Sequence, residues 1–305
     1  MAEAKEAGFV ISGALEEQGP KVSVYMPTKN RLESVLLAVS SVQRQTLSNF
    51  ELIIVDDGSD ERTCKEIAKA VAGDSRIIFL RNEKSAGACA ARNRAIRLAR
   101  GEFVTGLDDD DELHPGHLEG LVAYWSSLQR AEVEVSCLYV QYLQRLPSGL
   151  CESAKRSRVC SEDLFEANFV GNQIFAPRQR FIDAGLFDEQ MPAWQDLEFF
   201  YRVLQLFGPA RLFDAPTYHF DLMPRDDRIS SLQKEKILKA YALMFMKHGE
   251  GSVVRRQKLL LQVYSPYYGF SLNPNDFWRF LDRRGSVKML VKLALLLRER
   301  RRASA

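Results

Sequence analysis

The sequence predicts an α/β fold, with a mainly parallel sheet flanked by helices and a helical C-terminal extension. Short, nearly continuous apolar runs indicate strands buried on both faces, and they lie at residues 22–26, 52–55, 76–80 and 102–107. Stretches with helical spacing alternate with these runs, at residues 31–45, 61–72 and 87–100. This alternation is typical of right-handed βαβ units.

The second half of the chain gives weaker signals. Residues 133–146 could supply one or two strands, and "GNQIFAPRQRFIDAGLFDE" predicts a strand, a turn and a short helix. The stretch "AWQDLEFFYRVLQLFG" has apolar residues at helical spacing and a Gly208-Pro209 stop. From about residue 231 the chain is predicted to be mainly helical.

The composition is that of an ordinary globular protein: 305 residues, 46% hydrophobic and 27% charged. A net charge of +2 gives no case for nucleic-acid binding. The five cysteines are scattered and contain no CxxC pair, which argues against a zinc site or a disulfide framework. Without a secretory signal or an apolar run of about 20 residues, we expect a cytoplasmic protein.

Four consecutive aspartates, Asp108 to Asp111, follow the apolar run at 102–107. Like charges this close repel by about 1 kcal/mol per pair in water, and by about 4 kcal/mol near a protein surface. A helix start at Pro115 explains one or two carboxylates, and an acidic surface loop does not explain the place after a buried strand. The third interpretation is a divalent cation held by carboxylates and substrate phosphates.

Polar loops follow three of the predicted strands, at residues 27–31, 56–60 and 108–111. In parallel sheets the carboxyl ends of the strands meet at one edge, where ligands bind. The sequence therefore predicts a site at this edge.

The motifs in these loops resemble those of the family 2 glycosyltransferases, which have the GT-A fold. "VSVYMPTKNR" is similar to the family's opening strand, and "QTLSNFELIIVDDGSDE" to its second. "GACAARNRAIRLARGEFVTGLDDDDELHP" is similar to the block that carries the family's Asp-x-Asp pair. The likeness covers residues 21 to about 120, and continues more weakly to about 205.

The resemblance implies a nucleotide-sugar site in the first half of the chain. Pro27 and Thr28 would line the nucleotide pocket, and Asp57 would accept a hydrogen bond from N3–H of uracil or thymine. Arg92 would approach the donor's diphosphate or sugar, or alternatively pair with the aspartates. The motif does not separate a UDP-sugar from a dTDP-sugar.

The resemblance also assigns the aspartates. Asp108 and Asp109 would lie by the ribose and diphosphate, while Asp110, with Asp108, would bind Mn²⁺ or Mg²⁺. Asp111 fits a helix start better than a metal ligand. His219 could complete the metal shell, although the sequence favours a structural histidine.

The family's catalytic base is an aspartate at the start of a helix, followed by a downstream arginine. The match here is Gln195-Asp196 with Arg202, where glutamine replaces the family's glutamate. Transfer with inversion needs such a base to remove the acceptor's hydroxyl proton. The alternative is that Asp196 only caps the helix.

The implied activity is metal-dependent, inverting transfer of a hexosyl, N-acetylhexosaminyl or rhamnosyl group to a hydroxyl of a glycan or glycolipid. Lipopolysaccharide or other cell-surface polysaccharide synthesis would be its setting. The alternatives are a sugar-nucleotide-binding protein without turnover and a nucleotidyltransferase, although "PTKNRLES" lacks the glycines that would hold a triphosphate.

The expected organisation has a leader and three parts: residues 1–20, a nucleotide-sugar-binding half at 21–130, an acceptor and catalytic-base half at 131–230, and a helical extension at 231–305. The tail "KMLVKLALLLRERRR" combines an apolar stripe with basic residues. It could lie on an anionic membrane, peripheral to the inner face, or its leucines could pack on the protein.

Overall fold

The computed structural model describes residues 19–147, 149–221, 233–265 and 267–270, together with Leu295. Nearly all of the predicted leader and most of the basic tail lie outside the described residues. The interpretations of those two segments, including the membrane contact, therefore remain predictions. Among the described helices, none is both long and apolar enough to cross a membrane.

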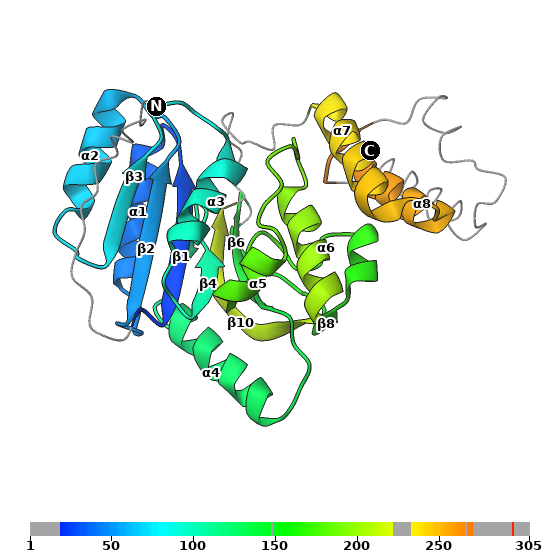
Figure 1. The fold of residues 1–305 in the computed structure, drawn as a ribbon, viewed down its shortest axis with the longest axis horizontal. Coiled ribbons are helices and arrows are strands. Elements are labelled where there is room, and N and C mark those ends of the chain that lie inside the picture. Colours follow the sequence, from blue (N-terminus) through cyan, green and yellow to red (C-terminus); the bar gives the residue numbers. More distant parts are fainter. Residues whose placement is uncertain (1–18, 148, 222–232, 266, 271–294, 296–305) are drawn as a thin grey trace, which may run out of the picture.

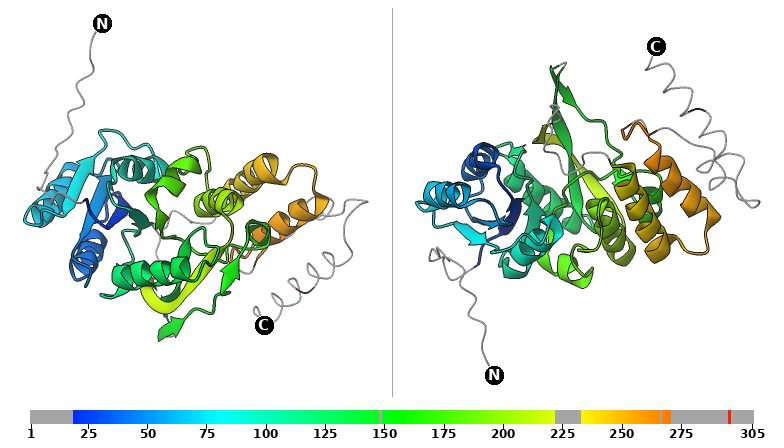
Figure 2. Two further views of the ribbon diagram at one scale, coloured as in Figure 1. Left: turned by 60° about the horizontal axis from the view of Figure 1, so that its bottom comes forward. Right: turned by 90° about the horizontal axis from the view of Figure 1, so that it is seen from above.

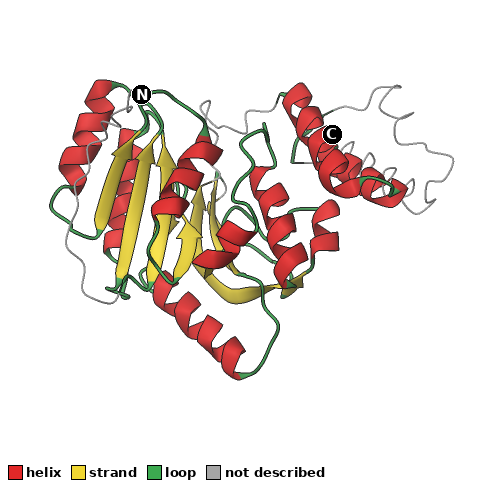
Figure 3. Cartoon of the chain, viewed as in Figure 1, coloured by secondary structure: helices red, strands yellow, loops and turns green. Residues whose placement is uncertain are grey.

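The first sheet confirms the predicted parallel arrangement (Figure 1). Its order is β3-β2-β1-β4-β9, and only β9 runs antiparallel to its neighbour. The arrowheads of the long strands point the same way in Figure 3, so their carboxyl ends share one edge. The strands are β1 (Val22–Thr28), β2 (Phe50–Asp56), β3 (Ile77–Arg81), β4 (Phe103–Gly106) and β9 (Ala176–Pro177).

Helices cover both faces of this sheet, which is why its strands are apolar almost throughout. Val24 and Met26 face one core, which includes residues of α1, α2 and α4. Tyr25 faces the other core, which includes residues of α3, α5 and α6. The helices are α1 (Leu32–Gln43), α2 (Glu61–Val71), α3 (Ala88–Leu98), α4 (His117–Arg130), α5 (Arg178–Asp183) and α6 (Gln195–Phe207).

A second sheet lies beside the first and is built mainly from the second half of the chain. Its order is β5-β10-β6-β7, and β8 pairs with β10. β10 runs parallel to β6 and antiparallel to β5, which follows the aspartate run directly. The strands are β5 (Glu112–Leu113), β6 (Leu138–Leu146), β7 (Gly149–Glu152), β8 (Arg158–Val159) and β10 (Ala210–Asp221).

The described part of the C-terminal extension is helical, as predicted, and packs beside α6 (Figures 1 and 2). It consists of α7 (Lys234–Met244), a π-helical turn η2 (Phe245–Gly249) and α8 (Val253–Val263). Gln262 of α8 donates to the carbonyls of Leu164 and Phe165 in the 3₁₀ turn η1 (Ser161–Phe165). Polar as well as apolar contacts therefore fix the extension to the second half of the chain.

Candidate active site at the carboxyl edge of the first sheet

The loops after β1, β2 and β4 meet at one edge, as predicted from the sequence. The hydroxyl of Thr28, at the end of β1, donates to Asp109 over 2.7 Å. The backbone N–H of Asp57, after β2, donates to the carbonyl of Thr28 over 2.8 Å. Pro27 lies beside them in β1, opposite Val55 of β2.

Asp108 is held by three side chains. Arg92 of α3 donates to its Oδ1 over 2.9 Å, and Gln173 donates to the same oxygen over 3.1 Å. Asn172 donates to Oδ2 over 3.1 Å. Arg92 pairs with Asp108, and its approach to the donor's diphosphate or sugar stays a prediction. Arg92 also lies 3.3 Å from Oε1 of Gln195, and so connects the aspartate run to the start of α6.

Asn172 and Gln173 were not identified from the sequence. The Tyr25 hydroxyl donates to Oε1 of Gln173 over 2.8 Å, which orients that amide toward Asp108. The close approach needs Gly106 at the end of β4, because a Cβ there would lie 1.8 Å from the same Oε1. One sequence feature could have pointed to them: the polar pair Asn172-Gln173 stands between Gly171 and the apolar run "IFA".

Asp109 and Asp110 share one cation of the chain itself. Nη1 of Arg31 lies 3.0 Å from Oδ1 of Asp109 and 3.2 Å from Oδ2 of Asp110. Burial raises the pKa of Asp109 to about 6, while Thr28 and Arg31 act to lower it. Arg31 belongs to the motif "VSVYMPTKNR", but its pairing with Asp109 and Asp110 was not predicted from the sequence.

Asp111 is buried in the second sheet, and its assignment to a helix start was wrong. α4 begins at His117, and its N-cap residue is Gly116. The Asp111 carboxylate instead accepts from the Tyr218 hydroxyl over 2.8 Å and from the backbone N–H of Asp221 over 3.1 Å. Burial, followed by the charge of Asp108, holds the pKa of this carboxyl well above its usual range.

The chain itself thus offsets much of the repulsion in the aspartate run. Arg92 pairs with Asp108, and Arg31 pairs with Asp109 and Asp110. Asp111 resists ionisation because it is buried. The charge balance of this loop therefore does not by itself require a divalent cation.

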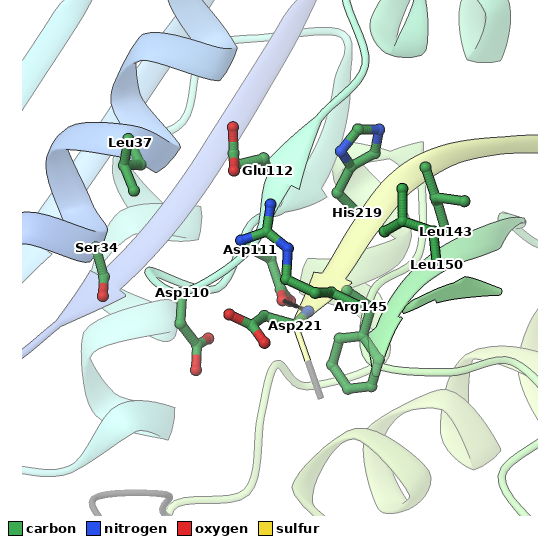
Figure 4. A pocket seen from close by; sticks show the side chains of 11 residues that line it. Ser34, Leu37, Asp110, Asp111, Glu112, Leu143, Arg145, Leu150, His219 and Asp221 are labelled. Carbon is green, nitrogen blue, oxygen red and sulfur yellow. Dashed lines mark hydrogen bonds between the residues drawn. The ribbon is translucent and has the colours of Figure 1, made fainter. Parts of the chain in front are cut away.

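The residues fit a divalent cation that arrives with a phosphate ligand. Among the described residues, no group of three or more His, Cys, Asp or Glu side chains is placed to hold a metal. Asp110 does offer a hard carboxylate at the edge of a pocket (Figure 4). Mg²⁺ is commonly bound by one or two carboxylates plus substrate phosphates, so a single well-placed aspartate suits that chemistry.

His219 lines the same pocket as Asp110 (Figure 4). It lies opposite Glu112 in the β5–β10 ladder. Burial lowers its pKa, which favours the neutral ring. In the view of Figure 4 the Arg145 side chain lies between His219 and Asp110, and the metal role of His219 remains untested.

The Asp57 carboxylate already accepts four hydrogen bonds from the loop before α3. A carboxylate has about four acceptor positions, so donors of the chain itself occupy all of those on Asp57. A nucleobase N3–H would have to replace one of these donors. They are the side chains of Asn82 and Ser85, at 2.8 and 2.6 Å, and the backbone N–H groups of Ala86 and Gly87, at 2.9 and 2.8 Å.

Asp196 is the second residue of α6, and the capping interpretation is wrong. The N-cap residue is Trp194, at φ 58°, and it makes no side-chain cap. In the described part of the chain Oδ1 of Asp196 is buried and has no hydrogen-bond partner. Burial raises the pKa of Asp196 to about 7, with Arg92 acting to lower it and Asp108 to raise it.

Gln195 and Arg202, the two neighbours of Asp196 in the matched motif, both make contacts within the chain. Gln195 donates to the carbonyl of Met191 over 3.2 Å rather than to Asp196. Arg202 makes a bidentate pair with Glu198, at 2.9 and 2.7 Å. Arg202 also donates to the carbonyls of Ala184 and Leu186, after α5, so the chain itself occupies its guanidinium.

The profile of the family described as "Glycosyl transferase family 2" matches residues 23–145. The "Putative colanic acid biosynthesis glycosyl transferase WcaA" of Escherichia coli K12 is 34% identical over 236 residues, which cover 76% of this chain and 82% of that protein. The chain belongs to the family 2 glycosyltransferases. It is therefore a glycosyltransferase, and the polar edge of the first sheet is its candidate active site.

Another relative is a glucosyltransferase of Campylobacter jejuni. It is named "GalNAc(5)-diNAcBac-PP-undecaprenol beta-1,3-glucosyltransferase" and is 30% identical over 178 residues, or 56% of each chain. Among solved structures, Staphylococcus aureus TarS in complex with UDP-GlcNAc matches with a TM-score of 0.60 at 16% identity, covering 85% of this chain and 78% of that one. The mannosyltransferase PcManGT from Pyrobaculum calidifontis, in complex with GDP-Man and Mn²⁺, matches with a TM-score of 0.53 at 16% identity, covering 92% and 80%. These two structures establish the GT-A fold.

Proposed function

We propose that this glycosyltransferase moves a sugar, with inversion, from a UDP- or dTDP-sugar to a hydroxyl of a glycan or lipid-linked acceptor. The observation that carries this proposal is Asp196: a partly buried residue whose buried Oδ1 has no hydrogen-bond partner among the described residues, and whose pKa is raised to about 7. A general base works best when its pKa lies near the working pH, because it must first be deprotonated and then accept a proton. Asp196 meets that condition.

In this mechanism Asp196 accepts the acceptor's hydroxyl proton as the oxygen attacks the anomeric carbon. Arg92 lies between Asp108 and Gln195, and its charge favours the ionised form of Asp196. Asp108, held by Asn172 and Gln173, would face the ribose or diphosphate together with Asp109. Arg92, Asp108 and Asp109 are held by hydrogen bonds within the chain before any substrate binds.

A divalent cation, Mn²⁺ or Mg²⁺, would be bound by Asp110 with Asp108 as its partner. When bound, it would neutralise the charge of the departing nucleoside diphosphate. Pro27 and Thr28 would line the nucleotide pocket, with Asp57 facing the base edge.

Cell-surface polysaccharide or lipopolysaccharide synthesis in a bacterium is the proposed setting. The relatives named for colanic acid synthesis and for an undecaprenol-linked acceptor support it. All five cysteines are free thiols, which suits the cytoplasm. We place the enzyme there, peripheral to the inner face of the membrane where a lipid-linked acceptor would be reached.

The first test is calorimetric titration of UDP and of dTDP, each with and without Mn²⁺. Wild type, Asp110→Ala and Asp196→Asn would be compared. Asp183→Asn is a surface control, because Asp183 is exposed and accepts from Gln179 in α5. We expect Mn²⁺-dependent binding that Asp110→Ala loses and Asp196→Asn keeps.

The second test is sugar transfer from the bound donor to a library of glycan acceptors. Asp196→Asn should lower kcat by at least 100-fold with little change in the donor's KM, and Asp183→Asn should match wild type. Full transfer by Asp196→Asn would remove that residue from the mechanism. Nucleotide binding without transfer by wild type to any acceptor would favour a sugar-nucleotide-binding protein.

A further inference from the structure

Arg31 occupies the position in the aspartate run where an added cation would be expected. It is the N-cap residue of α1, directly after the β1 loop, and it makes no side-chain cap. Its Nη1 atom lies within 3.2 Å of both Asp109 and Asp110. The Arg31 side chain is only 14% exposed, and those of Asp109 and Asp110 are 8% and 18% exposed. The contact is therefore a shielded one, in which charge matters more than on the open surface.

We propose that Arg31 is a built-in counter-ion that holds Asp110 when no divalent cation is present, and that the cation must displace it. This inference rests on the proposed role of Asp110 as a metal ligand. It adds that the chain itself competes with the metal for that carboxylate.

The geometry requires competition. A Mg²⁺ ion sits about 2.0–2.1 Å from its oxygen ligands, so a cation on Oδ2 of Asp110 would lie very near the guanidinium. Two positive charges at that separation repel strongly in a partly buried site. The guanidinium and the cation therefore exclude each other at Oδ2.

The displacement needs only a small movement, because one nitrogen makes both contacts. Asp109 also accepts from Thr28 through its other oxygen, which fixes it beside the β1 loop. Nη1 can therefore stay on Oδ1 of Asp109 while it leaves Oδ2 of Asp110. The positive charge is retained in the site, next to where a diphosphate would bind.

The consequence is coupling between the cation and the donor. A cation alone gains few protein ligands at Asp110 and has to overcome Arg31. A cation carried by a nucleoside diphosphate brings phosphate oxygens of its own, and the same phosphates attract the displaced guanidinium. Arg31 should therefore weaken binding of the bare cation more than binding of the cation–nucleotide pair.

The test measures Mn²⁺ binding by the loss of the free-Mn²⁺ electron paramagnetic resonance signal, with and without UDP. The variants are Arg31→Gln and Arg31→Lys. Arg44→Gln is the matched control, since Arg44 also lies on the α1 side, is 55% exposed and pairs with Glu112 at 3.8 Å. Thermal unfolding in EDTA is followed in parallel.

We expect Arg31→Gln to bind Mn²⁺ alone at least fivefold more tightly than wild type, with a smaller additional gain from UDP. In EDTA it should melt at a lower temperature, and Mn²⁺ should restore more of that loss than in wild type. Arg31→Lys should bind Mn²⁺ with intermediate affinity, because an ammonium keeps the charge but is a point donor that fits two carboxylates less well. Arg44→Gln should behave as wild type.

Unchanged or weaker Mn²⁺ binding by Arg31→Gln overturns the inference. If that variant does not fold with or without Mn²⁺, Arg31→Lys decides, and wild-type affinity in it overturns the inference. Asp110→Asn separates this failure from failure of the proposed function. If Asp110→Asn loses UDP-dependent Mn²⁺ binding, Asp110 keeps its proposed role as a metal ligand even when the results for Arg31 overturn the inference. If wild type binds no Mn²⁺ even with UDP, both the metal role of Asp110 and the inference about Arg31 are overturned.

Discussion

Asp196 and Asp57 are both acidic residues at the carboxyl edge of the first sheet, yet their pKa values move in opposite directions. Burial dominates at Asp196 and raises its pKa to about 7. Burial also acts to raise the pKa of Asp57, but hydrogen bonds from its own loop outweigh it and the pKa is lowered. The first residue is suited to accept a proton and the second to stay ionised.

The raised pKa of Asp196 predicts a pH-dependent stability difference. Its carboxyl ionises at lower pH in the unfolded chain than in the folded one, so the folded state holds the extra proton between about pH 4 and 7. Stability is therefore greatest below the unfolded value and is lost as pH rises toward 7. Asp196→Asn removes this loss. Each unit by which the folded pKa exceeds the unfolded pKa corresponds to about 1.4 kcal/mol of unfolding free energy.

The measurement is the thermal midpoint of Asp196→Asn minus that of wild type, from pH 4.5 to pH 8. The other titrating groups largely cancel in this difference. We expect the difference to grow in favour of the variant up to about pH 7 and then level off. A difference that is flat over this range would show that Asp196 titrates normally in the folded protein.

If Asp57 contacts the nucleobase as proposed, we predict that Ser85 limits that contact. It is exposed, and its hydroxyl holds one acceptor position on the carboxylate. Ser85→Ala frees that position without removing the backbone donors, so we expect UDP to bind several-fold more tightly. CDP is the control, because N3 of cytosine carries no hydrogen. An equal gain for both nucleotides, or none for UDP, would contradict this role for Asp57.

Sequence reasoning located the acidic side chains of this site better than their partners. Asp108 and Asp110 were found because four adjacent carboxylates after a buried strand demand an explanation. Asn172 and Gln173 were missed because they lie about 65 residues after Asp108 in the sequence. They contact Asp108 only because the two halves of the chain pack together. The same packing buries Asp111 beside Tyr218, which local helix rules could not indicate.

At the scale of elements, the C-terminal extension supports the start of α6. Trp194 donates its indole N–H to the hydroxyl of Tyr268 over 2.8 Å, and Lys247 pairs with Asp188 in the preceding loop. Trp194 has a positive φ, which is unfavourable for a bulky residue unless its surroundings hold it. Since Asp196 follows two residues later, these contacts help to aim the proposed base.

Tyr268→Phe should therefore lower kcat for transfer more than it changes the donor's KM. Loss of one partly buried hydrogen bond should also cost about 1 kcal/mol of unfolding free energy. Tyr267→Phe is the matched control, because Tyr267 is the adjacent residue and is 61% exposed. A purely structural role for Tyr268 would lower stability and leave kcat per folded enzyme unchanged.

The strands and helices were predicted more securely than the details at their ends. β1 to β4 and α1 to α3 follow from apolar periodicity, because burial on a sheet or helix face sets that pattern directly. Pro115 was expected to open a helix, but α4 begins two residues later at His117. The β5–β10 pairing occupies the chain just before Pro115, and such a long-range contact leaves no local signal.

At the scale of the whole molecule, the net charge of +2 conceals strong local compensation at the site. The acidic run is balanced by arginines from two different helical regions, Arg31 before α1 and Arg92 in α3. A ligand that adds both a cation and an anionic diphosphate preserves this balance. Such a ligand should stabilise the folded protein without requiring a rearranged core.

Saturating Mn²⁺ with UDP should therefore raise the unfolding temperature of wild type, while neither alone should raise it as much. Ligand at about 100 times its dissociation constant contributes about 2.7 kcal/mol, which for a chain of this size corresponds to a shift of roughly 4 °C. Asp110→Asn should lose most of this shift, because the cation loses its protein carboxylate. Glu112→Gln, which removes a charge beside the same pocket, should keep it. Scanning calorimetry of the three proteins decides the point, since equal shifts in Asp110→Asn and wild type would mean that the nucleotide binds without this aspartate.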